Sequence, residues 1–144
     1  MADGRPGATM TPVGLVTEPS RYPIEETRER LLGSIDSRGL TVFAQIDHAA
    51  AAKAIGLELR PTMVVIFGNP AAGTLLMQSA QTFGVDLPLR ALIWEDEAGN
   101  TWVSHDDLSW LADRHRLAPE ANATVGAMTR GLNTIVQQAT GTAE

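Results

Sequence analysis

Hydrophobic and polar positions along the chain follow two different periods, and together they predict strands and helices in alternation. Apolar runs at 13–18, 40–47 and 62–68 have the length and composition of strands. The third run, TMVVIFG, is almost continuously apolar, which is typical of a strand covered on both faces. Two further runs, near 88–95 and 101–104, flank the polar segment EDEAGN and predict a hairpin.

The segments between these strands have the spacing and the end signals of helices. Helices are predicted at 23–38, 48–56, 69–84 and 106–115, followed by a C-terminal helix. Pro23 and Pro70 suit first helical turns, whereas Gly39, Gly56 and Gly84 suit helix ends. The order of elements, with a hairpin among them, predicts an α+β fold: a mixed sheet of about five strands with helices packed on it.

The length of 144 residues fits a single domain with one core. We expect a flexible N-terminal tail over residues 1–12, the α+β domain over 13–117 and an amphipathic C-terminal helix over 118–144. The helix is predicted from apolar residues at helical spacing, which favour core or dimer packing over a cofactor contact. These residues are Val125, Met128, Leu132, Ile135 and Ala139.

Charge and composition narrow the classes of function. Seventeen acidic and eleven basic residues give a net charge of −6, and Lys53 is the only lysine, so a nucleic-acid partner is not expected. The absence of cysteine excludes disulfides, thiolate nucleophiles and cysteine-based metal sites. No apolar run reaches the length of a membrane span and the N-terminus lacks the apolar stretch of a signal peptide, so we expect a cytoplasmic protein without a membrane partner.

The segment QIDHAAAAKAIG places an acid and an imidazole at the junction between a predicted strand and a predicted helix. Asp47 is in position to cap the helix, and this role alone explains it. If the alternation of Val42, Ala44 and Ile46 continues, the side chain of His48 points toward the buried face of the sheet. A half-buried imidazole there could act as a base, bind a metal or haem, or form a hydrogen bond in the core, and the core role is favoured.

The segment FGNPAAGT, residues 67–74, imitates a phosphate-binding loop between a strand and a helix. It lacks the lysine that should precede the hydroxyl residue Thr74, and Pro70 removes one of the amides that such a loop offers. Asn69 is therefore interpreted as a helix cap, with a bound anionic group at the helix start as the alternative.

Arg90 and Trp94 are predicted to lie on one face of the strand in PLRALIWED. An arginine among apolar neighbours needs a carboxylate or an anionic ligand, and an internal salt bridge is the favoured interpretation. His105, in SHDD, is interpreted as part of an exposed helix cap, although it could face His48 in the fold. His115 is expected on the surface at the end of a helix, where it complements the helix dipole.

No recognised catalytic or metal-binding motif is present. None of the histidine spacings matches a signature such as H-E-x-x-H, so a metal site would require His48, His105 and a carboxylate to converge in the fold. The chain also lacks the G-x-S-x-G elbow of serine hydrolases. The sequence therefore predicts no metal site and identifies no cofactor and no catalytic set.

Several segments in order resemble one protein family. GLVTEPSRYPIEETRERLLGSIDSRGLTVFAQIDHAAAA, VVIFGNPAAGT, DLPLRALIWEDEAGNTWVS and LADRH are similar to the bacterial and archaeal family called domain of unknown function 302, over roughly Gly14 to Leu117. The resemblance implies a small α+β domain that tends to form homodimers, without an established activity. The chain departs from the family pattern at His105, where tyrosine is common, and at Leu108, where proline is common.

These observations lead to one main hypothesis and two alternatives. The main hypothesis is a homodimeric, non-enzymatic domain that binds a small ligand, anionic if Arg90 contacts it, in a pocket near His48. The first alternative is a metal-dependent, haem-dependent or acid–base enzyme that uses His48, and the second is a purely structural or interaction protein. The candidate ligand-binding residues are Asp47, His48, Asn69, Arg90, Trp94 and His105.

Overall fold

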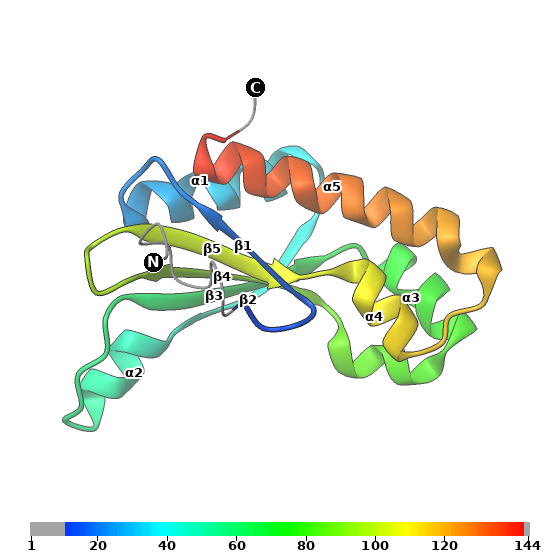
Figure 1. Cartoon of the computed structure of the whole chain (residues 1–144), viewed down its shortest axis with the longest axis horizontal. Coiled ribbons are helices and arrows are strands. Elements are labelled where there is room, and N and C mark those ends of the chain that lie inside the picture. The colour runs from blue at the N-terminus through cyan, green and yellow to red at the C-terminus, as the bar shows by residue number, and fades with distance from the viewer. Residues whose placement is uncertain (1–10, 143–144) are drawn as a thin grey trace.

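The strands and helices follow one another in the predicted order in the computed structural model, which describes residues 11–142 (Figure 1). The strands are β1 (Leu15–Pro19), β2 (Thr41–Asp47), β3 (Thr62–Gly68), β4 (Leu89–Glu95) and β5 (Thr101–Asp106). The α-helices are α1 (Ile24–Ser37), α2 (His48–Ala54), α3 (Pro70–Ser79), α4 (Leu108–Arg114) and α5 (Asn122–Thr140). Two 3₁₀ helices, η1 (Gln81–Asp86) and η2 (Pro119–Ala121), complete the fold.

The five strands form one sheet in the order β1-β5-β4-β3-β2. The α+β class with helices packed on a five-stranded sheet is confirmed, but every neighbouring pair is antiparallel where the sequence predicted a mixed sheet. The reason is that α2 and α3 connect strands that are neighbours in the sheet. Each of these helices therefore lies at an end of the sheet instead of crossing one of its faces.

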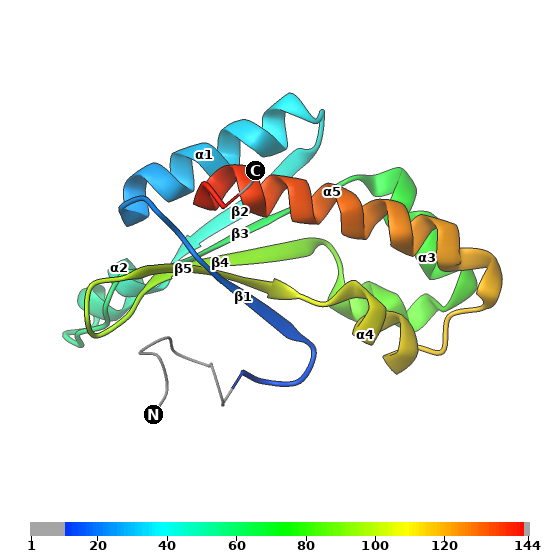
Figure 2. The ribbon, with the colours of Figure 1, turned by 45° about the horizontal axis from the view of Figure 1, so that its top comes forward.

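Helices α1 and α5 lie side by side across one face of the sheet, as Figure 2 shows. They bury the apolar side chains that β3, β4 and β5 direct toward them, including Val65, Phe67, Ile93 and Val103. Helix α2 lies at one end of the sheet, and α3, η1 and α4 lie at the other end (Figure 1). Within residues 11–142, no helix covers the second face of the sheet.

The predicted apolar stripe of the C-terminal helix is buried in α5. Four of its five residues, Val125, Leu132, Ile135 and Ala139, belong to the core, and Met128 packs against that core half-buried. The described part of the predicted C-terminal segment, residues 118–142, therefore contributes to the same core as residues 13–117. The predicted flexible tail falls largely on residues 1–10, which lie outside the described residues.

Strand β2 is an edge strand with a β-bulge, and this changes the direction of its side chains. Val42 lies opposite Phe67, whereas Ala44 lies opposite Ile66, so the bulge at Phe43 shifts the register between them. Val42 therefore faces the helices and Ala44 the uncovered face, since cross-strand partners share a face and successive residues alternate. The expectation that Val42 and Ala44 share one face is wrong for this reason.

The helix predicted over 69–84 is divided into α3 and η1 at Ala80, which has extended backbone angles (φ −146°, ψ 104°). A straight helix of 16 residues would be about 24 Å long. It would carry the chain away from the sheet, although β4 begins beside the end of β3. The break at Ala80 lets η1 return the chain to the start of β4, so Gly84 does not end a helix as predicted.

The turn of the predicted hairpin between β4 and β5 is organised by Asp96. Its carboxylate accepts hydrogen bonds from the backbone amides of Ala98 and Asn100 and, at 2.8 Å, from the indole N–H of Trp102. Partial burial raises the pKa of the Asp96 carboxyl, but these hydrogen bonds outweigh that effect and hold the pKa below its ordinary value of 3.8. Asp96 therefore stabilises the folded state as a carboxylate.

The substitution Asp96→Asn should lower the free energy of unfolding at pH 7 by about 1 kcal/mol, because an amide is a weaker acceptor than a carboxylate. A depressed folded-state pKa contributes stability that is present above the ordinary, unfolded-state pKa of 3.8 and is lost as the pH falls through the folded-state value. The difference between the two proteins should therefore vanish in acid. Urea unfolding between pH 2 and pH 7 measures it, and a difference independent of pH would contradict this account.

Candidate functional site

The six residues predicted to form a site are distributed over both ends and both faces of the sheet. Asp47 and His48 lie where β2 ends and α2 begins, whereas Asn69 lies at the opposite end, after β3. Because β2 and β3 are antiparallel neighbours of seven residues each, the two positions are separated by a strand length of roughly 20 Å. The structure therefore does not bring His48 and Asn69 together.

Asp47 caps α2, as predicted, and accepts a hydrogen bond from the backbone amide of Ala50 at 2.8 Å. The side chain of His48 is exposed, not directed into the core, because β2 is an edge strand and its register shifts at the bulge. An open cleft of about 720 Å³ lies beside α2 and is lined by Asp47, Lys53 and Glu58 among others. His48 is not among the residues that line it.

Arg90 and Trp94 lie on the face of the sheet that α1 and α5 leave uncovered, and both have protein partners. The guanidinium of Arg90 forms an ion pair with Asp106 at 2.9 Å, which is the internal salt bridge expected from the sequence. The indole N–H of Trp94 donates to the hydroxyl of Ser104 at 2.9 Å, and its ring stacks on Trp102 with 6.1 Å between centroids. These contacts within the protein account for Arg90 and Trp94 without a ligand.

His105 is buried on β5, so its predicted place in an exposed cap is wrong. Its Nδ1–H donates to the backbone carbonyl of Asp106 at 3.0 Å, since a carbonyl can only accept. The cap of α4 is Asp107, whose carboxylate accepts from the amides of Ser109 and Trp110. The side chain of His105 is therefore a buried, hydrogen-bonded part of the fold and not part of the cap.

His48 and His105 do not converge, because β2 and β5 are separated by two other strands in the sheet. Among residues 11–142, no group of three histidine, aspartate or glutamate side chains is arranged to hold a metal ion. The structure thus supplies no support for the metal-dependent alternative at His48.

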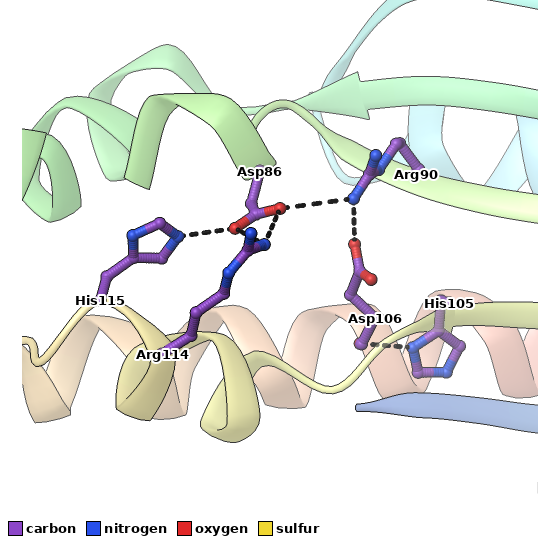
Figure 3. Close-up of polar contacts among 6 residues, drawn as sticks. All are labelled: Asp86, Arg90, His105, Asp106, Arg114 and His115. Atoms are coloured by element: carbon purple, nitrogen blue, oxygen red, sulfur yellow. Dashed lines mark hydrogen bonds and ion pairs between the residues drawn. The ribbon is translucent and has the colours of Figure 1, made fainter. Parts of the chain in front are cut away.

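A cluster that the sequence did not indicate is centred on Asp86, at the end of η1 (Figure 3). The carboxylate of Asp86 is buried and accepts hydrogen bonds from Arg114 at 3.0 Å and from Nε2 of His115 at 2.6 Å. The ring of His115 also hydrogen bonds to Thr82 at 2.9 Å and contacts Phe83. Only 6% of the His115 side chain is exposed, so its predicted surface position is wrong.

The Asp86 cluster extends to the sheet through Arg90, which lies 3.8 Å from Asp86 and 2.9 Å from Asp106, as Figure 3 shows. It thereby joins η1, β4, β5 and α4 at one end of the molecule. Both ring nitrogens of His115 form hydrogen bonds within the protein. No residue of the cluster lines the cleft beside α2 or the two cavities near α3 and α5. The arrangement acts as an ionic clasp between secondary-structure elements.

A more enclosed cavity, here named the α3 pocket, lies between α3, the bulge of β2 and the start of β4. It has a volume of about 310 Å³, and nearly all of its lining is apolar. The lining residues are Phe43, Gly68, Asn69, Pro70, Gly73, Thr74, Met77, Gly84, Leu87, Pro88, Leu89 and Met128. Of the predicted site residues, Asn69 alone lines this pocket, where its side chain accepts a hydrogen bond from the amide of Ala71.

Glycines shape the walls of the α3 pocket. A Cβ atom at Gly73 would stand 3.4 Å from a methyl group of Leu87, and one at Gly84 would stand 3.1 Å from the sulfur of Met77. The absence of side chains at Gly73 and Gly84 thus allows Leu87 and Met77 to pack close to the backbone at these positions. A side chain at Gly84 would have to displace the sulfur of Met77, whereas a Cβ at Gly73 would already touch Leu87.

A second hollow, here named the α5 depression, adjoins the α3 pocket. It has a volume of about 260 Å³ and lies between the end of α1 and α5. The two cavities share the lining residues Gly68, Asn69, Leu89 and Met128. Arg38 lines the depression and is the basic residue of the combined surface.

Comparison with known proteins identifies relatives in sequence and in fold. A family model described as "Domain of unknown function DUF302" matches residues 16–135, which includes most of α5 and extends beyond the expected limit at Leu117. The chain is also similar to the "Crystal structure of uncharacterized conserved protein DUF302 from Bacillus stearothermophilus", with a TM-score of 0.79. That likeness covers 89% of this chain and 99% of the other at 18% identity, so it concerns the fold alone.

Two curated relatives are both named "Fluoride-specific ion channel FluC 1", from Brucella suis biovar 1 (strain 1330) and Brucella abortus biovar 1 (strain 9-941). Each is 46% identical over 136 residues, which is 94% of this chain but 54% and 50% of the respective relative. The chain thus spans about half the length of the curated relatives it matches. Between residues 11 and 142, no helix has both the length and the apolar character needed to cross a membrane.

Neutralising the centre of the ionic clasp should destabilise the fold. We expect Asp86→Asn to lower the free energy of unfolding by about 2–3 kcal/mol, because Arg114 and His115 lose a buried charged acceptor. Asp113→Asn is the matched control, since Asp113 is exposed on α4. Urea unfolding at pH 7 measures both variants, and equal stability of the two would show that the clasp contributes nothing.

Proposed function

The chain belongs to the family of the domain of unknown function DUF302, and from the cavities of its fold we propose that it binds a small, largely apolar ligand in the α3 pocket. The observation that carries this proposal is the apolar lining of that pocket. A hollow of this kind is favourable for ligands because their apolar surface leaves water on binding. Its volume of about 310 Å³ is at the lower end of the range for small-molecule sites, about 300–1,000 Å³.

The proposed site differs from the pocket near His48 that the sequence suggested. The cleft beside α2 is larger, but it is open and has charged residues on its walls, among them Glu25, Lys53 and Glu58. His48 is exposed, and no described residue forms a hydrogen bond with its imidazole to orient it as a base. Asn69, at the α3 pocket, is the candidate residue that the proposed site retains.

The match with the Brucella proteins includes the whole region that forms the α3 pocket, because it covers 94% of the chain and Phe43 and Met128 both lie well inside the ends. Fluoride channel activity is the named property of those longer proteins. We propose that the half matched by this chain acts in them as a ligand-binding module. On this proposal, a ligand of the α3 pocket would act on the longer proteins through that half.

Binding to the α3 pocket can be measured with a neutral fluorescent probe, N-phenyl-1-naphthylamine. The wild-type protein should enhance its fluorescence, whereas Thr74→Trp should weaken binding at least about tenfold by filling the pocket from its rim. Leu75→Trp is the matched control: it places the same bulk on an exposed position of α3 that does not line the pocket.

A second readout of the same titration locates the probe within the protein. Methyl resonances of Met77 and Met128, which line the α3 pocket, should shift on binding, and that of Met63, which lines the cleft beside α2, should not. Equal probe binding by Thr74→Trp and the wild-type protein, or shifts confined to Met63, would refute the proposed site.

We also propose that the protein forms a homodimer through the uncovered face of the sheet. Apolar side chains from three neighbouring strands lie on this face: Ile46 is 42% exposed, and Val64, Ile66 and Leu92 are half-buried. Two such faces related by a twofold axis would pack as stacked sheets, about 10 Å apart. The pairing would remove these side chains from water.

Light scattering should give the wild-type protein twice the chain mass of 15.4 kDa, and Ile46→Glu should shift it toward that mass. A glutamate at this position would place two like charges in the interface. Val85→Glu, at an exposed apolar position away from the sheet, should remain dimeric. A wild-type protein that is monomeric at every concentration would exclude the proposed dimer.

A further inference from the structure

Arg38 holds an unusual position at the end of α1. Its backbone terminates the helix, and its side chain reaches α5, where Nη2 stands 3.3 Å from the place that a Cβ of Gly131 would occupy. Glycine within a helix is unfavourable relative to alanine. Here it leaves room for the guanidinium to lie close against α5, beside the α5 depression that Arg38 lines.

The guanidinium of Arg38 has no acidic partner. Among residues 11–142, none of the ion pairs or side-chain hydrogen bonds involves it. By contrast, Arg90 pairs with Asp86 and Asp106, and Arg114 pairs with Asp86. A guanidinium presents parallel N–H donors that match the two oxygens of a carboxylate. Arg38 therefore offers an available anion-binding group at the edge of an apolar surface.

The α3 pocket and the adjoining α5 depression form one continuous surface with an apolar end in the pocket and a basic end at Arg38. The α5 depression, which contains Arg38, shares Asn69 and Met128 with the α3 pocket, whose lining is mostly apolar. A molecule that fills the pocket with a hydrocarbon chain can thus direct a polar end toward the guanidinium. A single cation favours a single negative charge over a doubly charged phosphate, which would need further donors.

We infer that the ligand is a straight-chain monocarboxylate, with its alkyl chain in the α3 pocket and its carboxylate on Arg38. This inference rests on the proposed function, since it assigns the chemical class of the ligand of the same pocket. The contact is reversible binding without a covalent step. Because Arg38 is exposed, salt should weaken the carboxylate contact, whereas it should leave the apolar contact unchanged.

The test compares octanoate with 1-octanol, which has the same chain length but no charge, using the methyl resonances of Met77 and Met128. Both compounds should bind the wild-type protein. Arg38→Gln should weaken octanoate binding about tenfold and leave octanol within about twofold, because only octanoate loses a charge-assisted contact. Arg38→Lys should lose less than Arg38→Gln, since it keeps the charge without the paired donors.

Arg130→Gln is the matched control, because Arg130 is also an exposed arginine beside a glycine of α5 but lines neither cavity. It should leave both affinities unchanged. Unchanged thermal unfolding of each variant establishes that differences in binding do not arise from misfolding.

The outcomes separate this inference from the proposed function. Octanoate and octanol affinities that are equally insensitive to Arg38→Gln would overturn the carboxylate assignment and leave the α3 pocket intact. Octanoate binding that depends on Arg38 but not on Thr74→Trp would overturn the placement of the alkyl chain. If neither compound shifts the Met77 and Met128 resonances, both the inference and the proposed pocket fail.

Discussion

The packing of α1 and α5 against one face of an antiparallel sheet is the constraint on which the other features depend. Residues such as Val65 and Phe67 are fully buried in the core that this pair of helices covers. The removal of their apolar surface from water, together with close packing, stabilises the folded state. Because neighbouring strands are also neighbours in sequence over β2–β5, the remaining helices are confined to the ends of the sheet. Cavities arise there, where a helix meets the end of the sheet without filling the space beside it.

The ionic clasp and the α3 pocket are coupled through the chain itself. Asp86 is held by Arg114 and His115, and the next residue, Leu87, lines the pocket. The clasp therefore anchors to α4 the backbone next to Leu87, which forms one wall of the pocket. Loss of Arg114 or His115 would leave the buried carboxylate of Asp86 without one of its hydrogen-bond donors. The wall is accordingly defined by tertiary contacts and not by the local conformation of η1 alone.

The sequence was sufficient for most of the elements, although not for the break at Ala80 or the strand directions, and it was not sufficient for the site. Gly39 and Gly56, together with the hairpin turn at Asp96, set element ends that could be predicted from local backbone preferences. The Arg90 salt bridge also followed from the cost of an unpaired charge. By contrast, the pocket brings together Phe43, Met77 and Met128, which are distant in sequence, and no pattern of spacing indicates that they meet.

The errors at the three histidines have distinct physical causes. The burial of His48 was inferred from strand alternation, which a bulge shifts by one residue. His105 was expected on the surface as part of a helix cap, and His115 as a residue at a helix end that complements the helix dipole. Each is instead buried by an element that lies far away along the chain, α5 for the face that carries His105 and η1 for His115. Their burial depends on how those elements pack, which the residues around them do not encode.

The bulge at Phe43 has a consequence for the behaviour of the protein at high concentration. β2 is a free edge of the sheet, and Val42, Phe43 and Ile46 are all exposed on it, which is a composition that invites strand pairing between molecules. A bulge interrupts the regular row of backbone donors and acceptors that an incoming strand would need. The irregularity that provides a wall for the pocket thereby also protects this edge against aggregation.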